Sequence, residues 1–70
     1  MERYEFYSNI PRHLLGAFYI NICKNIEKGI KVNKMRNELD IIDKEASKRR
    51  ITIKELINDG ENFIHEKVYK

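Results

Sequence analysis

A run of basic residues between positions 44 and 54 is the clearest candidate for chemistry in this sequence. Five lysines and arginines lie there against one acid, Glu45: Lys44, Lys48, Arg49, Arg50 and Lys54. Such side chains bind phosphate oxygens, as they do in protein–nucleic-acid interfaces. Bases at the end of a helix also complement its dipole. A phosphate-binding cluster and a solvated helix end therefore both remain open interpretations.

The sequence lacks the patterns that catalysis or metal binding would require. Three hydroxyl side chains could act as nucleophiles, and none has a histidine beside it: Ser8, Ser47 and Thr52. No glycine-rich phosphate loop is present. His13 and His65 lie at opposite ends of the chain, and Cys23 is the single cysteine, so no metal-ligand spacing exists. We predict that the protein is not an enzyme and holds no metal or cofactor.

The elements that would position the basic run are helices. Apolar residues recur at steps of three and four, the spacing that collects side chains on one helix face: Met35, Leu39, Ile42 and Ala46. Thr52 and Glu55 fit a capping box, in which each side chain accepts a hydrogen bond from the other residue's backbone amide. We predict a mostly α fold with three helices, at about 10–28, 34–49 and 53–68.

The helix predicted at 10–28 has a broad apolar surface. Its apolar positions form a main stripe and a flanking stripe: Leu14, Leu15, Phe18, Tyr19, Ile22 and Ile26, then Ala17, Ile20 and Cys23. Such a helix is usually covered on two sides, either as the central helix of a bundle or at a contact between subunits. The core of a compact monomeric bundle would explain it equally well.

The size of the chain favours self-association. A chain of 70 residues makes a single domain, 1–70, near the lower size limit for one hydrophobic core. We therefore predict a homodimer. The residues predicted to contact a second subunit or a larger protein partner are Leu14, Phe18, Ile22, Ile30 and Val32.

Two glycines indicate local geometry. Gly29 stands just past a helix end, where a left-handed backbone is common. After it, residues 30–33 alternate apolar and polar like a strand, but they also fit a tight turn in which Asn33 caps the next helix. Gly60 falls on an apolar helix face, where it costs about 1 kcal/mol relative to alanine and so indicates a close helix crossing. For the aromatic N-terminal arm, residues 1–9, three interpretations stay open: a strand, a segment that docks on a partner subunit, or a frayed end.

Residues 30–64 resemble the ribbon-helix-helix family of dimeric DNA-binding regulators, which includes the Arc, MetJ and CopG repressors. A segment in which apolar and polar residues alternate precedes a helix. This helix ends in a small residue and a basic turn, and an Ile-Thr pair then precedes the start of a second helix, which contains Glu-Leu-Ile. The residues that carry the resemblance are Ile30, Lys31, Val32 and Asn33, then Leu39, Ile42, Asp43 and Ala46, then Lys48 to Thr52, and Glu55 to Ile57.

The resemblance implies a specific mode of DNA binding. In that family the strands of two subunits pair into a ribbon that enters the major groove. Carried over, Lys31 and Asn33 would contact bases, because lysine donates to guanine and asparagine bonds adenine. The start of the following helix would bind phosphate. The implied phosphate contacts are Arg49, Arg50, Thr52 and Lys54.

Two functions follow as predictions. The first is a small dimeric protein that binds duplex DNA, such as a transcriptional, plasmid or phage regulator. The alternative is a non-enzymatic helical interaction module, an inhibitor or adaptor whose helix 10–28 docks on a larger protein. The longest apolar run, from Leu14 to Ile20, is too short to span a bilayer, and the first residues lack a basic leader. We predict a cytoplasmic protein with no membrane partner.

Overall fold

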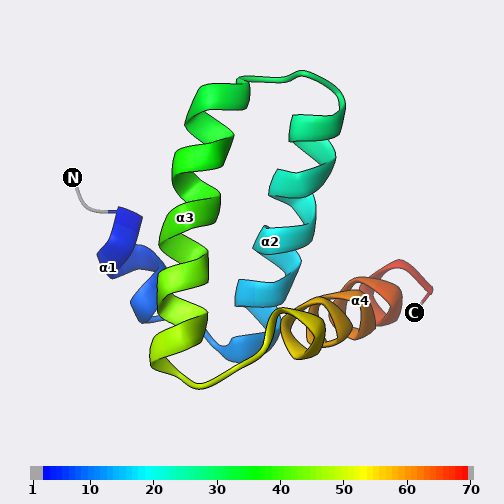
Figure 1. Cartoon of the computed structure of the whole chain (residues 1–70). Coiled ribbons are helices and arrows are strands. Elements are labelled where there is room, and N and C mark those ends of the chain that lie inside the picture. Colours follow the sequence, from blue (N-terminus) through cyan, green and yellow to red (C-terminus); the bar gives the residue numbers. More distant parts are fainter. Residues whose placement is uncertain (1–2, 70) are drawn as a thin grey trace.

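The computed structural model describes the backbone of residues 3–69 and the side chains of residues 5–65. Within this range the chain forms α1 (Arg3–Ser8), α2 (Arg12–Glu27), α3 (Val32–Lys48) and α4 (Ile53–Tyr69). Helices α2 and α3 form an antiparallel hairpin, α1 lies beside α3, and α4 runs across α2 at a steep angle (Figure 1). The described residues therefore form a plain bundle of four helices, one more than the three predicted. Residues 1–2 of the predicted arm lie outside the described range, and most of the rest is α1.

The predicted ribbon-helix-helix fold is wrong, because the described residues contain no strand. The turn after α2 explains why. Gly29 is left-handed, with φ of 74°, and its amide donates to Ile26 O at 3.0 Å. The Ile30 amide donates to Asn25 O at 2.9 Å. These two bonds form a Schellman motif, which ends α2 and turns the chain back.

The segment predicted as a strand therefore has no extended backbone to pair. The Ile30 amide is already bonded within its own chain, and Lys31 is left-handed, with φ of 44° and ψ of 50°. Helix α3 then begins at Val32, so Asn33 lies in its first turn. The tight-turn alternative is correct, although Lys31 and not Asn33 occupies the N-cap position and makes no side-chain cap bond.

A second Schellman motif joins α3 to α4. The Arg50 amide donates to Ser47 O at 3.0 Å, and the Ile51 amide donates to Ala46 O at 2.9 Å. Arg50 occupies the left-handed position, with φ of 62°, that glycine usually fills. Ile51 and Ala46 are both buried, as the hydrophobic contact of this motif requires.

The predicted capping box at the start of α4 is confirmed. The Glu55 amide donates to Thr52 Oγ1 at 3.1 Å, and the Thr52 amide donates to Glu55 Oε1 at 3.0 Å. These bonds lower the pKa of the Glu55 carboxyl below its ordinary value. Helix α4 therefore begins at Ile53, as predicted.

Helix α2 is the central element, and this accounts for its broad apolar surface. It packs against α3 along one side and α4 along another. The buried apolar side chains come from every helix and from the α3–α4 turn: Tyr7, Leu15, Ile22, Ile42, Ala46, Ile51 and Leu56. Phe18 is covered by the rings of Phe6 and Tyr7 of α1, whose centroids lie 5.5 and 5.8 Å away. Much of the stripe predicted as an interface is therefore covered within one chain.

The close helix crossing predicted from Gly60 is also confirmed. Gly60 meets Gly16 of α2, and both are buried. A Cβ on Gly16 would lie 2.7 Å from the Gly60 amide nitrogen, and a Cβ on Gly60 would lie 2.8 Å from the Ala17 nitrogen. Only two glycines allow the backbones of α2 and α4 to approach so closely.

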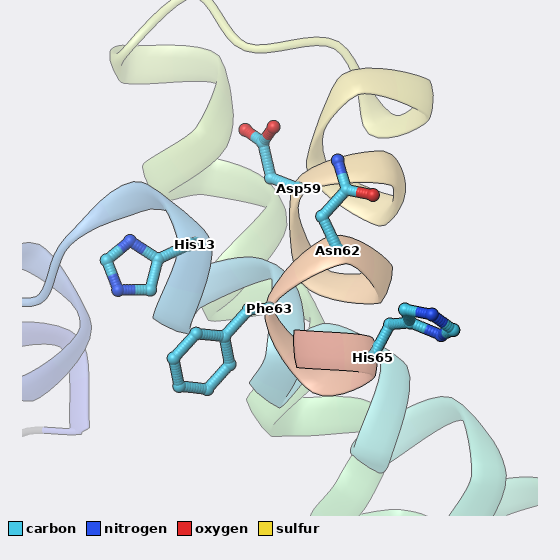
Figure 2. Close-up of a pocket in the computed structure, with 5 residues that line it drawn as sticks. All are labelled: His13, Asp59, Asn62, Phe63 and His65. Atoms are coloured by element: carbon cyan, nitrogen blue, oxygen red, sulfur yellow. The ribbon is translucent and has the colours of Figure 1, made fainter. Parts of the chain in front are cut away.

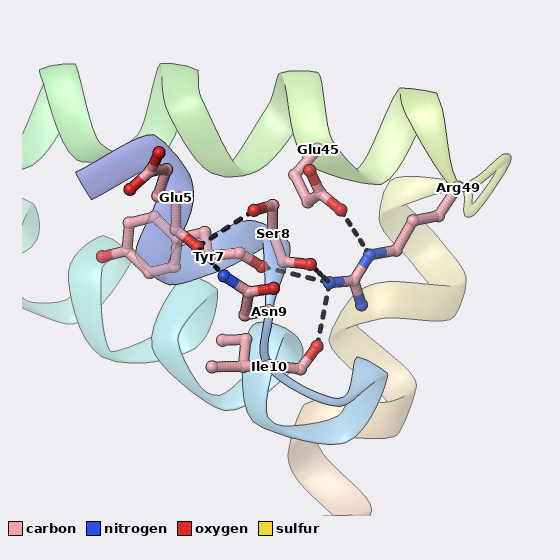
Figure 3. A network of polar contacts seen from close by, with 7 residues as sticks. All are labelled: Glu5, Tyr7, Ser8, Asn9, Ile10, Glu45 and Arg49. Carbon is pink, nitrogen blue, oxygen red and sulfur yellow. Dashed lines mark hydrogen bonds and ion pairs between the residues drawn. The ribbon is translucent and has the colours of Figure 1, made fainter. Parts of the chain in front are cut away.

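Helix α1 is held against α3 by two buried carboxylates. Arg49 Nε donates to Glu45 Oε2 at 2.6 Å, and its Nη2 donates to the carbonyl oxygens of Tyr7 at 3.0 Å and Ile10 at 2.8 Å (Figure 3). The Tyr7 hydroxyl donates to the Glu38 carboxylate, and both side chains are buried. A guanidinium at the end of α1 suits the carbonyls that a helix leaves unpaired there.

Candidate interaction surfaces

The structure separates the residues predicted to contact phosphate. Arg49 donates hydrogen bonds to the carbonyl oxygens of Tyr7 and Ile10, and only about a fifth of its side chain is exposed. Arg50 and Lys54 are exposed at the α3–α4 corner. Thr52 is exposed as well, but its hydroxyl accepts the Glu55 amide in the capping box. The basic run therefore does not form one continuous set of free cations.

A second basic region lies at the opposite end of α3, around the turn between α2 and α3. The segment from Lys28 to Asn37 contains four bases and no acid: Lys28, Lys31, Lys34 and Arg36. All four side chains are exposed, and the described residues provide no ion pair to any of them. The first turn of α3 also lacks an acid, so the helix dipole adds to the positive potential. We call residues 28–37 the hairpin end; it includes the predicted base contacts Lys31 and Asn33, both exposed.

The residues predicted to contact a second subunit are dispersed. Ile22 is in the core, and Leu14, Phe18 and Val32 are partly buried. Ile30 is 45% exposed at the hairpin end, the largest exposed fraction among the exposed large apolar side chains of the described residues. Only Ile30 of this set offers an apolar side chain that its own chain leaves largely uncovered.

A shallow groove with a volume of about 240 Å³ lies between α2 and α4. Its walls are mainly apolar and come from side chains that are only partly buried: Tyr19, Ile20, Cys23 and Ile57. Three exposed charged residues stand at its rim, the acids Glu27 and Glu61 and the base Lys24. The groove is thus an apolar depression with a rim of net negative charge.

Two side chains in the walls of this groove, Cys23 and Tyr19, have pKa values above their ordinary values and so favour their uncharged forms. Burial, with Glu27 and Asp43 nearby, raises the pKa of the Cys23 thiol. Burial also raises the pKa of Tyr19, with Cys23 and Asp43 adding to the shift. A thiol with a raised pKa is a poor nucleophile, since the thiolate is the reactive form. The walls of the groove are therefore mainly apolar and uncharged.

Another surface hollow contains both histidines of the chain. It is lined by His13, Asp59, Asn62, Phe63 and His65 (Figure 2). The His13 ring packs against Phe63 with a centroid distance of 4.9 Å and a tilt of 37°, and Arg12 pairs with Asp59. The two imidazoles lie on opposite sides of Phe63 in Figure 2. No three His, Cys, Asp or Glu side chains come together as metal ligands among the described residues.

Sequence reasoning found the apolar stripes but missed the groove. Ile20 and Cys23 belong to the flanking stripe of the helix predicted at 10–28, and Ile57 lies in the helix predicted at 53–68. Their meeting depends on the crossing at Gly16 and Gly60, which the pattern of one helix cannot specify.

Comparisons with known protein families, with curated proteins and with solved structures found no match. Among the described helices, none has the length and apolarity needed to cross a membrane.

Proposed function

We propose that this protein is a non-enzymatic helical interaction module whose groove between α2 and α4 binds a protein segment. The observation that carries this proposal is the groove itself, where Ile20, Cys23 and Ile57 remain partly exposed beside two acids. Removing apolar surface from water contributes roughly 25 cal/mol per Å², so a partner's aliphatic side chain would be stabilised there.

The charges at the rim restrict the kind of segment that fits. Glu27 and Glu61 outnumber Lys24, and the exposed side of α4 adds the acid Glu55. Opposite charges at an interface rim favour the matching partner and disfavour others. The groove therefore suits an aliphatic residue flanked by lysine or arginine.

Two tetrapeptides of the same shape and opposite charge test this proposal. Acetyl-Lys-Gly-Ile-Lys-amide and acetyl-Glu-Gly-Ile-Glu-amide would be titrated to millimolar concentration into the ¹⁵N-labelled full chain. We expect the basic peptide to shift the backbone amide resonances of Ile20, Cys23 and Ile57, and the acidic peptide to leave them in place. Equal shifts with both peptides, or none with the basic one, would reject the proposal.

Binding of duplex DNA is the second candidate, and the hairpin end favours it. Four exposed cations without an acid in residues 28–37 provide the positive surface that phosphate binding requires. In this candidate the contacts come from side chains around a helical turn, and no strand enters the major groove. The exposed side of α4 is acidic and would be repelled by phosphate.

The salt dependence of binding tests this candidate. Fluorescence anisotropy with a labelled duplex should show affinity that falls with salt, with a log–log slope of roughly −0.9 for each phosphate that the protein neutralises. A Lys28→Gln, Lys31→Gln, Lys34→Gln triple variant should flatten that slope. An Arg50→Gln, Lys54→Gln double variant, at the opposite end of α3, should change it less. Absence of binding at low salt would reject DNA as a ligand.

A further inference from the structure

We infer that the groove between α2 and α4 takes Ile30 of a second copy of this chain, so that two copies exchange their hairpin ends reciprocally. The inference rests on the proposed function and names the partner of the same groove. It requires an uncovered apolar residue flanked by bases on one copy, and an apolar depression with an acidic rim on the other.

Ile30 is unusual when it is compared with Ile51. Both isoleucines occupy the same position of a Schellman motif, where an apolar residue normally packs on the preceding helix. Ile51 packs on Ala46 and is only 8% exposed, whereas Ile30 follows Asn25 and is 45% exposed. The second motif is thus complete within one chain, and the first lacks its apolar contact.

The flanks of Ile30 complement the rim of the groove. Lys28 and Lys31 stand on either side of Ile30, are exposed and have no ion pair among the described residues. The groove presents Glu27 and Glu61 around an apolar floor. The left-handed backbones of Gly29 and Lys31 fix this short turn, so little conformational freedom would be lost on binding.

The groove and Ile30 are also close enough in the fold for a closed dimer. Glu27 is both the last residue of α2 and part of the groove rim, and Ile30 follows it by three residues. In two copies related by a two-fold axis, Ile30 of each copy can therefore enter the groove of the other through one shared contact area. In such an interface residue i contacts residue j in both directions, and the assembly stops at two copies.

Lys28 and Lys31 also belong to the surface that favours duplex DNA. Self-association and duplex binding would therefore compete for the same side chains. The Ile30→Ser variant, which keeps both lysines, should therefore bind duplex at least as tightly as the wild-type chain.

Sedimentation velocity over a range of protein concentrations tests the inference. We expect the wild-type chain to dimerise and an Ile30→Ser variant to dimerise about 100-fold more weakly, since the substitution removes the same apolar side chain from both grooves, at roughly tenfold each. Ile53→Ser is the matched control, because Ile53 is 38% exposed but does not line the groove. A wild-type chain that stays monomeric, or equal weakening in both variants, would overturn the inference without affecting the peptide test of the groove.

Charge reversal tests the reciprocal geometry. A Lys28→Glu, Lys31→Glu variant has acids on both the hairpin end and the rim, and a Glu27→Lys, Glu61→Lys variant has bases on both. Each should be monomeric alone, with an unchanged far-ultraviolet circular dichroism spectrum. An equimolar mixture should form a heterodimer, because both contacts then join unlike charges. A mixture that does not associate, or that forms assemblies larger than a dimer, would overturn the reciprocal arrangement.

Discussion

Gly16 of α2 and Gly60 of α4 face each other so closely that neither position has room for a methyl group. Gly16→Ala should destabilise the protein by about 3 kcal/mol, since the added carbon would force two backbones apart. Urea unfolding measures this change in stability.

Gly29→Ala is an informative comparison, because Gly29 has open space around it but a backbone φ of 74°. It should cost about 1 kcal/mol, and Gly29→Asn less, as asparagine tolerates the left-handed region.

Arg49 should be the most important cation for stability. Arg49→Ala removes its bonds to α1 and leaves the carboxylate of Glu45, which is 3% exposed, without its partner. Loss of one member of a buried ion pair costs about 3 to 5 kcal/mol. Arg36→Ala, which removes an exposed cation of α3, should change the free energy of unfolding by less than about 0.5 kcal/mol. Equal effects in thermal unfolding would show that Arg49 does not hold α1.

The Asp43 carboxyl should make the protein less stable as pH rises. Its pKa is raised by burial and by Asp40, and its buried Oδ1 accepts no hydrogen bond from the described residues. The folded state therefore binds the proton more tightly than the unfolded state, and stability falls as pH rises from the unfolded pKa through the folded pKa. Asp43→Asn should raise the melting temperature at neutral pH, and its advantage should shrink in acid. A gain that grows in acid would contradict this assignment.

The capping box should have the opposite pH dependence. Because the pKa of Glu55 is lowered, its contribution is present above the unfolded pKa and is lost as pH falls through the folded pKa. Thr52→Ala should cost about 1 kcal/mol at neutral pH. The cost should be smaller in acid, where the Glu55 side of the box is already protonated. Thermal melts of both chains at the two pH values measure this difference.

Local signals predicted the local structure correctly. The capping box at Thr52 and Glu55 and the left-handed Gly29 each depend on few neighbouring residues, and both are confirmed. Gly60 indicated a close helix crossing, which is also confirmed, but its position could not identify Gly16 as the partner. The error at residues 30–33 has a physical cause, because four alternating residues fit a strand and a turn equally well. The Schellman bond from Ile30 to Asn25 decides between them, and a two-residue period cannot reveal it.

Features that depend on residues far apart in the sequence could not be predicted. Helix α1 is too short to be stable alone, and it forms because Tyr7 and Arg49 connect it to buried carboxylates of α3. The same interaction pairs Arg49 within the fold and leaves only about a fifth of its side chain exposed, so counting bases along the sequence overestimated the free cations there. The groove arises only where α2 and α4 cross, from residues more than thirty positions apart, such as Cys23 and Ile57.

The most direct test of reciprocal binding uses the single cysteine of the chain, because Cys23 lines the groove. In an Ile30→Cys variant, kept at high protein concentration to offset the weaker contact of the smaller side chain, mild oxidation with oxidised glutathione should join Cys23 of one copy to the introduced thiol of the other and release two reduced glutathiones. The reaction should be slow, since the Cys23 thiol has a raised pKa. We expect a covalent dimer on non-reducing electrophoresis, with peptide mapping that identifies this bond, and no such bond in an Ile53→Cys control. A covalent dimer that forms equally in both variants, or that joins only the two introduced thiols, would contradict the groove as the site of binding.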